Sequence, residues 1–386
     1  MSVTAARGFR AAGVAAGLRA GGATGPDVAL VANDGPSTSA AGVFTANRVK
    51  AAPVLWSQQV VAGGEVRAVL LNAGGANACT GPAGFADTHA SAEHVAGLFG
   101  CGAAEIAVAS TGLIGERLTL DRLLDGAGTA FAQLGEAGGD DAAEAIRTTD
   151  TRSKQAVAQH PSGVTVGGMA KGAGMLAPAL ATMLCVLTTD AVADSADLDR
   201  ALRGAVAETF DRLDTDGCMS TNDTVLLLAS GASGVRLPAG DLAALADQVC
   251  GELADALLRD AEGASKWIRI ETVGAGSTAD AVETGRAVAR SNLFKCAIHG
   301  GDPNWGRVLS AVGTTTASYE PDRIAVTING VEVCRDGAAA ADRSLVDMSG
   351  PDVHVLIDLH AGGAAATIRT TDLTADYVHE NSAYST

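Results

Sequence analysis

The stretch with the most specific chemical potential is KGAGMLAPALATMLCVLTTD, which covers residues 171–190. Lys171 stands in its glycine-rich approach, and Thr182 stands where that approach meets a continuous apolar run. A threonine that opens a strand is ordinary, because β-branched residues favour strands. The glycines and Pro178 could also hold a strained peptide bond at this junction, which would make Thr182 a candidate nucleophile.

Self-cleavage would give this threonine a second catalytic group. The Thr182 hydroxyl would attack the carbonyl of Ala181, an N-to-O acyl shift would form an ester, and water would release a new N-terminus. A free α-amine has a pKa of about 8 and can accept the proton of its own residue's hydroxyl. The stretch therefore predicts a cut between Ala181 and Thr182 that unites nucleophile and base in one residue.

Composition restricts the class of partner. The chain has 386 residues, 47% of them hydrophobic, and a formal net charge of −17. Such a charge argues against nucleic acid or an anionic membrane surface as the main partner and leaves small molecules open. We also expect no membrane span, because no apolar segment reaches about 18 uninterrupted residues.

The seven cysteines are scattered and contain no CxxC pair. Free thiols in a reducing compartment explain this best, so we expect a cytoplasmic protein without a disulfide framework. The seven histidines do not cluster with the cysteines, so we expect no metal site. Asn222-Asp223-Thr224 matches a glycosylation sequon, which has no meaning in the cytoplasm.

Short apolar runs bounded by glycine predict buried strands, and longer runs with apolar residues at helical spacing predict helices. The expected strands lie within residues 66–75, 105–112, 182–190 and 224–231, and the expected helices within 118–134, 195–213 and 241–260. Residues 323–334 carry Asn329-Gly330 between alternating runs, which indicates a type I′ hairpin. Residues 352–372 suggest a second hairpin around Ala361-Gly362-Gly363.

The segment GGMAKGAGMLAPALATMLCVLTTDA resembles the self-cleavage region of the ornithine acetyltransferases, which are also called glutamate N-acetyltransferases of the arginine cycle. The resemblance extends over nearly the whole chain. Its other motifs, in order, are GFRAAGVAAG, DGPSTSAAGVFTANRVKAAPV, STGLIGE, AIRTTDT, DAEGASK, DPNWGRVL and ATIRTTDLTADYVHENSAYST.

The resemblance implies that cleavage yields chains 1–181 and 182–386, which stay folded together and assemble as an (αβ)₂ or larger species. Thr182 would take the acetyl group from N-acetylornithine and pass it to glutamate in a ping-pong reaction of arginine biosynthesis. No cofactor is implied, although some members of the family accept acetyl-CoA as a co-substrate.

The resemblance also implies the site residues. The oxyanion donors would be the Thr111 hydroxyl and the Gly112 N–H, within a Ser-Thr-Gly that follows an apolar strand. Lys171 would hold the substrate's α-carboxylate and Glu262 the amine of ornithine. The complete substrate-binding set would be Thr148, Lys171, Thr182, Glu262, Asn381 and Thr386. The chain departs from the family pattern at Ala73 and Gly75, where serine and asparagine are usual.

The fold implied is an α/β fold: an αββα sandwich like that of the N-terminal-nucleophile proteins, with a smaller α/β module. We expect the main domain to span 1–284, the smaller module to span 285–365, and the tail 366–386 to return to the main domain.

Other functions remain open at this point. An amidase or aminopeptidase on the same scaffold would use water in place of glutamate, and a paralogue in a specialised pathway would use another acceptor. An uncleaved binding protein is a third possibility, against which the Thr182 motif argues. Ornithine release that does not depend on glutamate would favour the hydrolase.

Overall fold

The computed structural model describes residues 2–19, 24–175 and 183–383, which fall into two compact units. Unit 1 contains the chain up to Asp211 together with Cys218–Asp260, and unit 2 contains Arg212–Gly217 and the chain from Ala261. The boundary thus follows Asp260 and differs from the expected residue 285. The reason is that β10 (Trp267–Ala275) is an inner strand of the unit 2 sheet.

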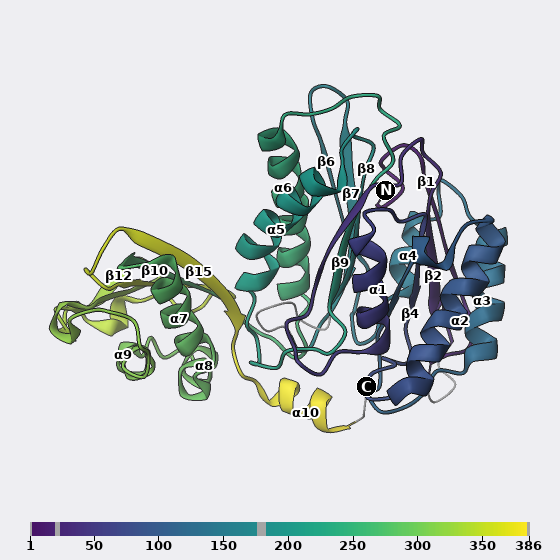
Figure 1. The fold of residues 1–386 in the computed structure, drawn as a ribbon. Helices are drawn as coiled ribbons and strands as arrows, with labels where there is room; N and C mark the ends of the chain where they lie inside the picture. Colours follow the sequence, from purple (N-terminus) through teal and green to yellow (C-terminus); the bar gives the residue numbers. More distant parts are fainter. Residues whose placement is uncertain (1, 20–23, 176–182, 384–386) are drawn as a thin grey trace. The chain divides into compact units, whose positions relative to one another are not determined.

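Unit 1 is built on two sheets (Figure 1). The four-stranded sheet has the order β1 (Phe9–Val14), β2 (Val28–Asn33), β4 (Ala68–Asn72) and β5 (Ile106–Ser110). The five-stranded sheet has the order β3 (Ala40–Phe44), β9 (Thr224–Ala229), β8 (Leu184–Thr189), β7 (Thr165–Lys171) and β6 (Lys154–Gln159). Most of these strands are buried along their whole length, as expected for sheets that are covered on both faces.

The two sheets pack face to face. Ala29 and Val31 of β2 share one core cluster with Met169, Val186 and Leu226 of the five-stranded sheet. The alternate residues of β2 point the other way, because successive strand side chains face opposite sides. The helices on the outer faces are α2 (Gly81–Phe99) and α3 (Leu120–Ala132) on the first sheet, and α5 (Ser195–Glu208) and α6 (Ala239–Leu258) on the second. Unit 1 is therefore an αββα sandwich, as expected.

Two further helices, α1 (Ala52–Ala62) and α4 (Gly139–Ala145), contribute Val60 and Ala142 to the core between the sheets. The expected helical spacing is confirmed in α6, where the apolar stripe from Leu242 to Leu257 is buried. The remaining short 3₁₀ turns are Ala103–Glu105, Phe210–Arg212, Pro321–Arg323 and Arg343–Leu345.

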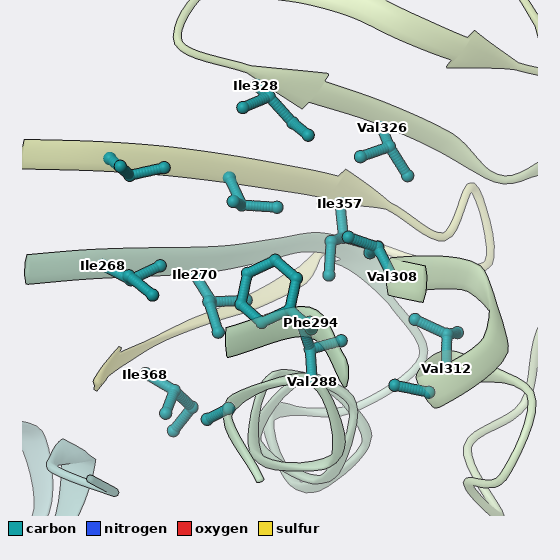
Figure 2. Packing of buried hydrophobic residues seen from close by; sticks show 14 of the residues in the cluster. Ile268, Ile270, Val288, Phe294, Val308, Val312, Val326, Ile328, Ile357 and Ile368 are labelled. Carbon is teal, nitrogen blue, oxygen red and sulfur yellow. The ribbon is translucent and has the colours of Figure 1, made fainter. Parts of the chain in front are cut away.

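Unit 2 is a six-stranded sheet with helices packed against it (Figure 1). The strand order is β13 (Ala338–Ala339), β12 (Val331–Arg335), β11 (Ala325–Ile328), β14 (Asp352–Asp358), β10 and β15 (Ala364–Thr371). The helices packed against the sheet are α7 (Thr278–Ala289), α8 (Asn292–His299) and α9 (Trp305–Val312), whereas α10 (Ala375–Ala383) follows β15 and has no buried residue. Figure 2 shows its core, where Val288 and Phe294 of the helices meet Ile270, Ile357 and Ile368 of the sheet.

One predicted hairpin is confirmed and the other is wrong. β11 and β12 pair antiparallel around Asn329 and Gly330, whose φ angles of 45° and 83° fit a type I′ turn. β14 and β15 do not pair with each other. Instead β10 lies between them, parallel to β14 and antiparallel to β15.

The tail was expected to return to the main domain, but its described part belongs to unit 2. Residues 366–371 lie within β15, and the Thr374 hydroxyl donates to the Gly263 carbonyl at 2.6 Å just before α10. Among the helices of the described chain, none combines the length and apolar character needed to cross a membrane.

Candidate active site

The segment after β5 forms a tight backbone junction. The Thr111 N–H donates to the Asn72 carbonyl at 3.0 Å, and the Gly75 N–H donates to the Thr111 carbonyl at 3.0 Å. Gly112 has a φ of 132°, and a Cβ placed on it would lie 2.5 Å from the Gly75 nitrogen. Glycine is therefore required at 112. The loop in which Ala73 and Gly75 depart from the family pattern lies directly against Thr111.

Lys171, the last residue of β7, contacts Thr111. Its Nζ donates to Thr111 Oγ1 at 3.1 Å, and both residues are 1% exposed. An ammonium group has no acceptor site, so the threonine oxygen must be the acceptor in this contact. The hydroxyl hydrogen of Thr111 is thereby left to point elsewhere. A donor oriented in this way suits the stabilisation of an oxyanion.

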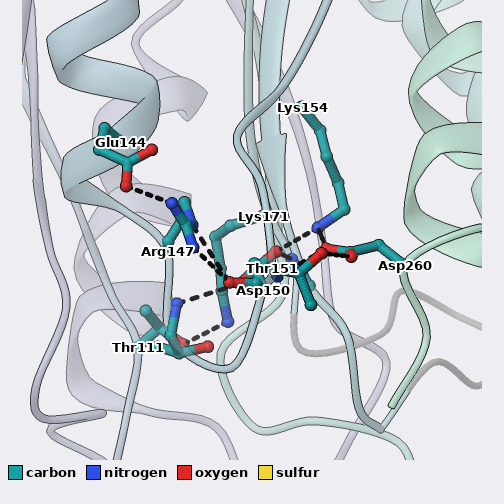
Figure 3. A network of polar contacts seen from close by, with 10 residues as sticks. Thr111, Glu144, Arg147, Asp150, Thr151, Lys154, Lys171 and Asp260 are labelled. Atoms are coloured by element: carbon teal, nitrogen blue, oxygen red, sulfur yellow. Dashed lines mark hydrogen bonds and ion pairs between the residues drawn. The ribbon is translucent and has the colours of Figure 1, made fainter. Parts of the chain in front are cut away.

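A buried ion network lies beside this pair (Figure 3). Lys154 Nζ lies 2.5 Å from Asp150 Oδ1 and 2.5 Å from Asp260 Oδ2, and all three side chains are almost fully buried. The Thr151 hydroxyl donates a further hydrogen bond to the Asp260 carboxylate. The lysine thus joins the segment after α4 to the start of the segment that follows α6.

Asp150 also organises the backbone around the site. Its Oδ1 accepts from the Gly172 N–H at 2.7 Å, and its Oδ2 accepts from the Thr148 N–H at 3.0 Å. Burial alone would raise the pKa of Asp150, but the charges of Lys171 and Lys154 lower it to about 2. Asp150 is therefore an anion at neutral pH, and it fixes Thr148 next to the segment that follows Lys171.

Met183 directly precedes β8, the strand that pairs with β7. The Met183 N–H donates to Asp223 Oδ1 at 2.9 Å, and its carbonyl accepts from the Thr224 N–H at 3.0 Å. Leu184, the next residue, pairs with Lys171 in the sheet register. Both predicted cleavage residues, Ala181 and Thr182, lie outside the described residues.

Asn222 connects this region to the Thr111 segment. Its Nδ2 donates to the Ala76 carbonyl at 2.6 Å and to the Ser110 carbonyl at 2.8 Å. Next to it, burial raises the pKa of the Asp223 carboxyl well above its usual range, and the Met183 N–H and the Lys171 charge offset this only in part. A hollow of about 30 Å³ opens here. It is lined by Ala76, Thr111, Gly112, Ile114, Met175, Ser220, Thr221 and Asn222.

The predicted site residues divide between the two units. Thr111, Gly112, Thr148 and Lys171 belong to unit 1, where Lys171 contacts Thr111 directly and Asp150 accepts from the Thr148 N–H and interacts with the Lys171 charge. Glu262 and Asn381 belong to unit 2, where the Asn381 Nδ2 donates to Glu262 Oε2 at 3.0 Å. Thr386 lies outside the described residues.

Sequence reasoning missed four polar residues that build the site. Asp150 and Lys154 are charged residues with almost no exposure, and Asn222 and Asp223 are 3% and 0% exposed. Asp150 stands inside the AIRTTDT motif, so the motif itself was a signal. Asn222 and Asp223 were interpreted as part of a chance sequon, and a polar pair before a strand gives no signal of burial.

Among the described residues, no group of three or more histidine, cysteine or acidic side chains could hold a metal ion. The seven cysteines all have free thiols. The chemistry available in the described part of the site is therefore that of hydroxyl, ammonium, carboxyl and amide groups.

Comparisons with known proteins give a consistent result. A family model described as the ArgJ family matches residues 10–386. The Arginine biosynthesis bifunctional protein ArgJ of Streptomyces coelicolor is 63% identical over 100% of both chains, and that of Thermobifida fusca is also 63% identical over 100% of both. A solved ornithine acetyltransferase from Mycobacterium tuberculosis, complexed with ornithine, is 60% identical over 46% of this chain and 94% of that chain, with a TM-score of 0.45.

Proposed function

Because the chain belongs to the ArgJ family, we propose that it transfers an acetyl group from N-acetylornithine to glutamate through an acetylated Thr182. Membership makes it an acyltransferase of arginine biosynthesis. The observation that carries the proposed mechanism is the Lys171–Thr111 hydrogen bond, which leaves the threonine hydrogen available to a developing oxyanion.

Cleavage comes first in this proposal. The Thr182 oxygen attacks the Ala181 carbonyl carbon, the peptide C–N bond breaks, and the hydroxyl proton ends on the released nitrogen. Water then hydrolyses the ester and leaves a free α-amine on Thr182. Met183, the residue that follows the proposed nucleophile, directly precedes β8, and the first residue of β8 pairs with Lys171.

Transfer then proceeds in two half-reactions. The α-amine of Thr182 takes the hydroxyl proton while the oxygen attacks the acetyl carbonyl, and that proton leaves with the amine of ornithine. The amine of glutamate then attacks the acetyl-threonine ester, the C–O bond of the ester breaks, and the α-amine of Thr182 carries the proton lost by that amine to the threonine oxygen as N-acetylglutamate leaves. In both steps Thr111 and Gly112 would donate to the oxyanion.

Substrate contacts follow from charge. Lys171, with Thr148 near it through Asp150, would hold an α-carboxylate. Glu262 would bind the amine of ornithine, and Asn381 would hold the carboxylate of Glu262 in place. Thr386 is part of the same proposal.

Three further properties extend the proposal. We propose acetyl-CoA as a second acetyl donor, since the similar proteins are named bifunctional. The two cleaved chains would assemble as (αβ)₂ or a larger species. The enzyme would work in the cytoplasm, which agrees with its free thiols.

The test is the intact mass of the purified chain together with an ornithine-release assay. Wild type should give chains 1–181 and 182–386 and should release ornithine from N-acetylornithine only when glutamate is present. Thr182→Ala should stay as one inactive chain, and Thr182→Ser should retain part of both activities. Thr129→Ala, at an exposed position of α3, is the matched control and should behave as wild type. Equal ornithine release without glutamate would establish a hydrolase instead.

A further inference from the structure

Two consecutive side chains, Asn222 and Asp223, contact two different segments of the site. Asn222 donates to the carbonyls of Ala76 and Ser110, which flank the hollow on the side of the oxyanion donors. Asp223 accepts from the N–H of Met183, the residue after the proposed nucleophile. Both side chains are buried, so neither interaction competes with water.

We propose that Asn222 and Asp223 form a clamp that sets the nucleophile against the oxyanion donors, with both acting as positioning residues. This inference rests on the proposed function. The clamp has one amide on the 110–112 side and one carboxyl oxygen on the 183 side, joined by a single peptide bond. The short covalent link leaves little freedom between the two sides.

The backbone of Met183 is held at both of its polar groups. Asp223 accepts from its N–H, and the N–H of Thr224 donates to its carbonyl. The second of these contacts belongs to the pairing of β8 with β9 and needs no particular side chain. The first depends on the side chain at 223, and its loss would leave a buried N–H without an acceptor.

The oxygen of Asp223 matters more than its charge in this inference. Only Oδ1 contacts Met183, and Oδ2 has no hydrogen-bond partner in the described parts of the chain. The Ser220 side chain lies close enough to lower the pKa of the Asp223 carboxyl, and its oxygen also accepts from the Asn222 N–H. An asparagine at 223 carries the same acceptor oxygen, so it should preserve the clamp.

The clamp touches no substrate in the proposed mechanism, so its loss should affect kcat more than KM. A displacement of about 1 Å in a reacting group lowers the rate by about 100-fold. We therefore expect Asp223→Ala to slow both self-cleavage and acetyl transfer by about that factor, with KM for N-acetylornithine and glutamate changed by less than the rate.

The experiment compares Asp223→Ala and Asp223→Asn with a matched pair of controls at the other end of β8. Asp190 follows β8, is 1% exposed, and accepts from the Thr165 N–H at 2.9 Å. Asp190→Ala and Asp190→Asn thus remove or keep a buried acceptor for a backbone N–H away from the site, and both also remove the ion pair of Asp190 with the exposed Arg7. Asn222→Ala is paired in the same way with Asn33→Ala, because Asn33 Nδ2 also donates to two carbonyls, those of Ser37 and Ala229.

Three measurements are made on the full chain: the time course of cleavage by intact mass, kcat and KM per cleaved chain, and the melting temperature. The expected result is a loss of kcat in Asp223→Ala and Asn222→Ala, rescue in Asp223→Asn, and a lowered melting temperature without loss of kcat in Asp190→Ala and Asn33→Ala.

The clamp is overturned if Asp223→Ala keeps its kcat, if Asp223→Asn falls as far as alanine, or if the controls lose kcat equally. A wild-type chain that neither cuts nor transfers would overturn the proposed function and the clamp together. An active wild type with unimpaired Asp223→Ala overturns the clamp alone.

Discussion

Asp150 in unit 1 and Asp214 in unit 2 are both buried aspartates, yet their pKa values shift in opposite directions. Both are at most 3% exposed. The pKa of Asp150 falls to about 2, whereas burial raises the pKa of Asp214 to about 6 in spite of the Arg290 charge beside it. Burial therefore does not decide the charge state of a carboxyl group in this molecule.

The difference lies in the donors. Both oxygens of Asp150 accept hydrogen bonds, from Lys154 and Gly172 on one side and Thr148 on the other. Asp214 accepts from Arg290 through Oδ2, and its Oδ1 has no hydrogen-bond partner within the described chain. A buried anion is stable only when donors satisfy it fully, and Asp214 falls short of that.

The largest expected effect comes from removing the lysine that serves two carboxylates. Lys154→Met should destabilise unit 1 by about 3–5 kcal/mol, because Asp150 and Asp260 would be left buried without their cation. Chemical denaturation, followed by a probe in unit 1, measures the change.

The matched control is Arg203→Met, which breaks an exposed pair with Asp199 on α5. Exposed pairs contribute little, so its midpoint should not move measurably. Equal midpoints for the two variants would contradict the importance that we assign to the Asp150 network.

The second effect concerns Asp214. A folded-state pKa of about 6 against an ordinary 3.8 means that folding binds a proton, so this group lowers stability as pH rises from about 4 to 6. The full difference corresponds to about 3 kcal/mol. Asp214→Asn should flatten this slope, as measured by hydrogen exchange of β10 and β15 amides over that pH range. A slope that is unchanged in the variant would assign it to another group.

The smallest expected effect is the loss of folding stability at low pH, where Asp150 becomes protonated. Its pKa is depressed from 3.8 to about 2, so its stabilising contribution is complete above pH 4 and is lost as pH falls through 2. The loss amounts to about 2 kcal/mol. Carboxyl NMR shifts of the folded protein should show a midpoint near 2 for this residue, and an ordinary midpoint would remove the contrast with Asp214.

Local patterns predicted most elements of this fold correctly. Apolar runs located β4, β5, β8 and β9, and Asn329-Gly330 located a hairpin, because each signal is contained in a short window. The pairing of β14 and β15 failed for the opposite reason. The strand that separates them, β10, comes from a distant part of the chain, and no short window contains that information.

The site shows the same division. Thr111, Gly112 and Lys171 were predicted because they lie in motifs that resemble a family, and the structure brings Thr111 and Lys171 into contact. Asn222 and Asp223 were missed because amide and carboxyl side chains before a strand usually face solvent in a turn. Only the packing of the two sheets reveals that they are buried.

The strand order of the five-stranded sheet has a consequence for the proposed cut. β3, β7 and β6 precede residue 181, whereas β8 and β9 follow it, so in this sheet the strands of the second proposed product lie between strands of the first. β8 and β9 are held along both edges, by β7 on one side and β3 on the other. The second product is therefore interleaved with the first, and separating them would require breaking two ladders and opening the core. Dilution alone would not separate the two products, and the proposed cut would add chain ends without weakening the sheet.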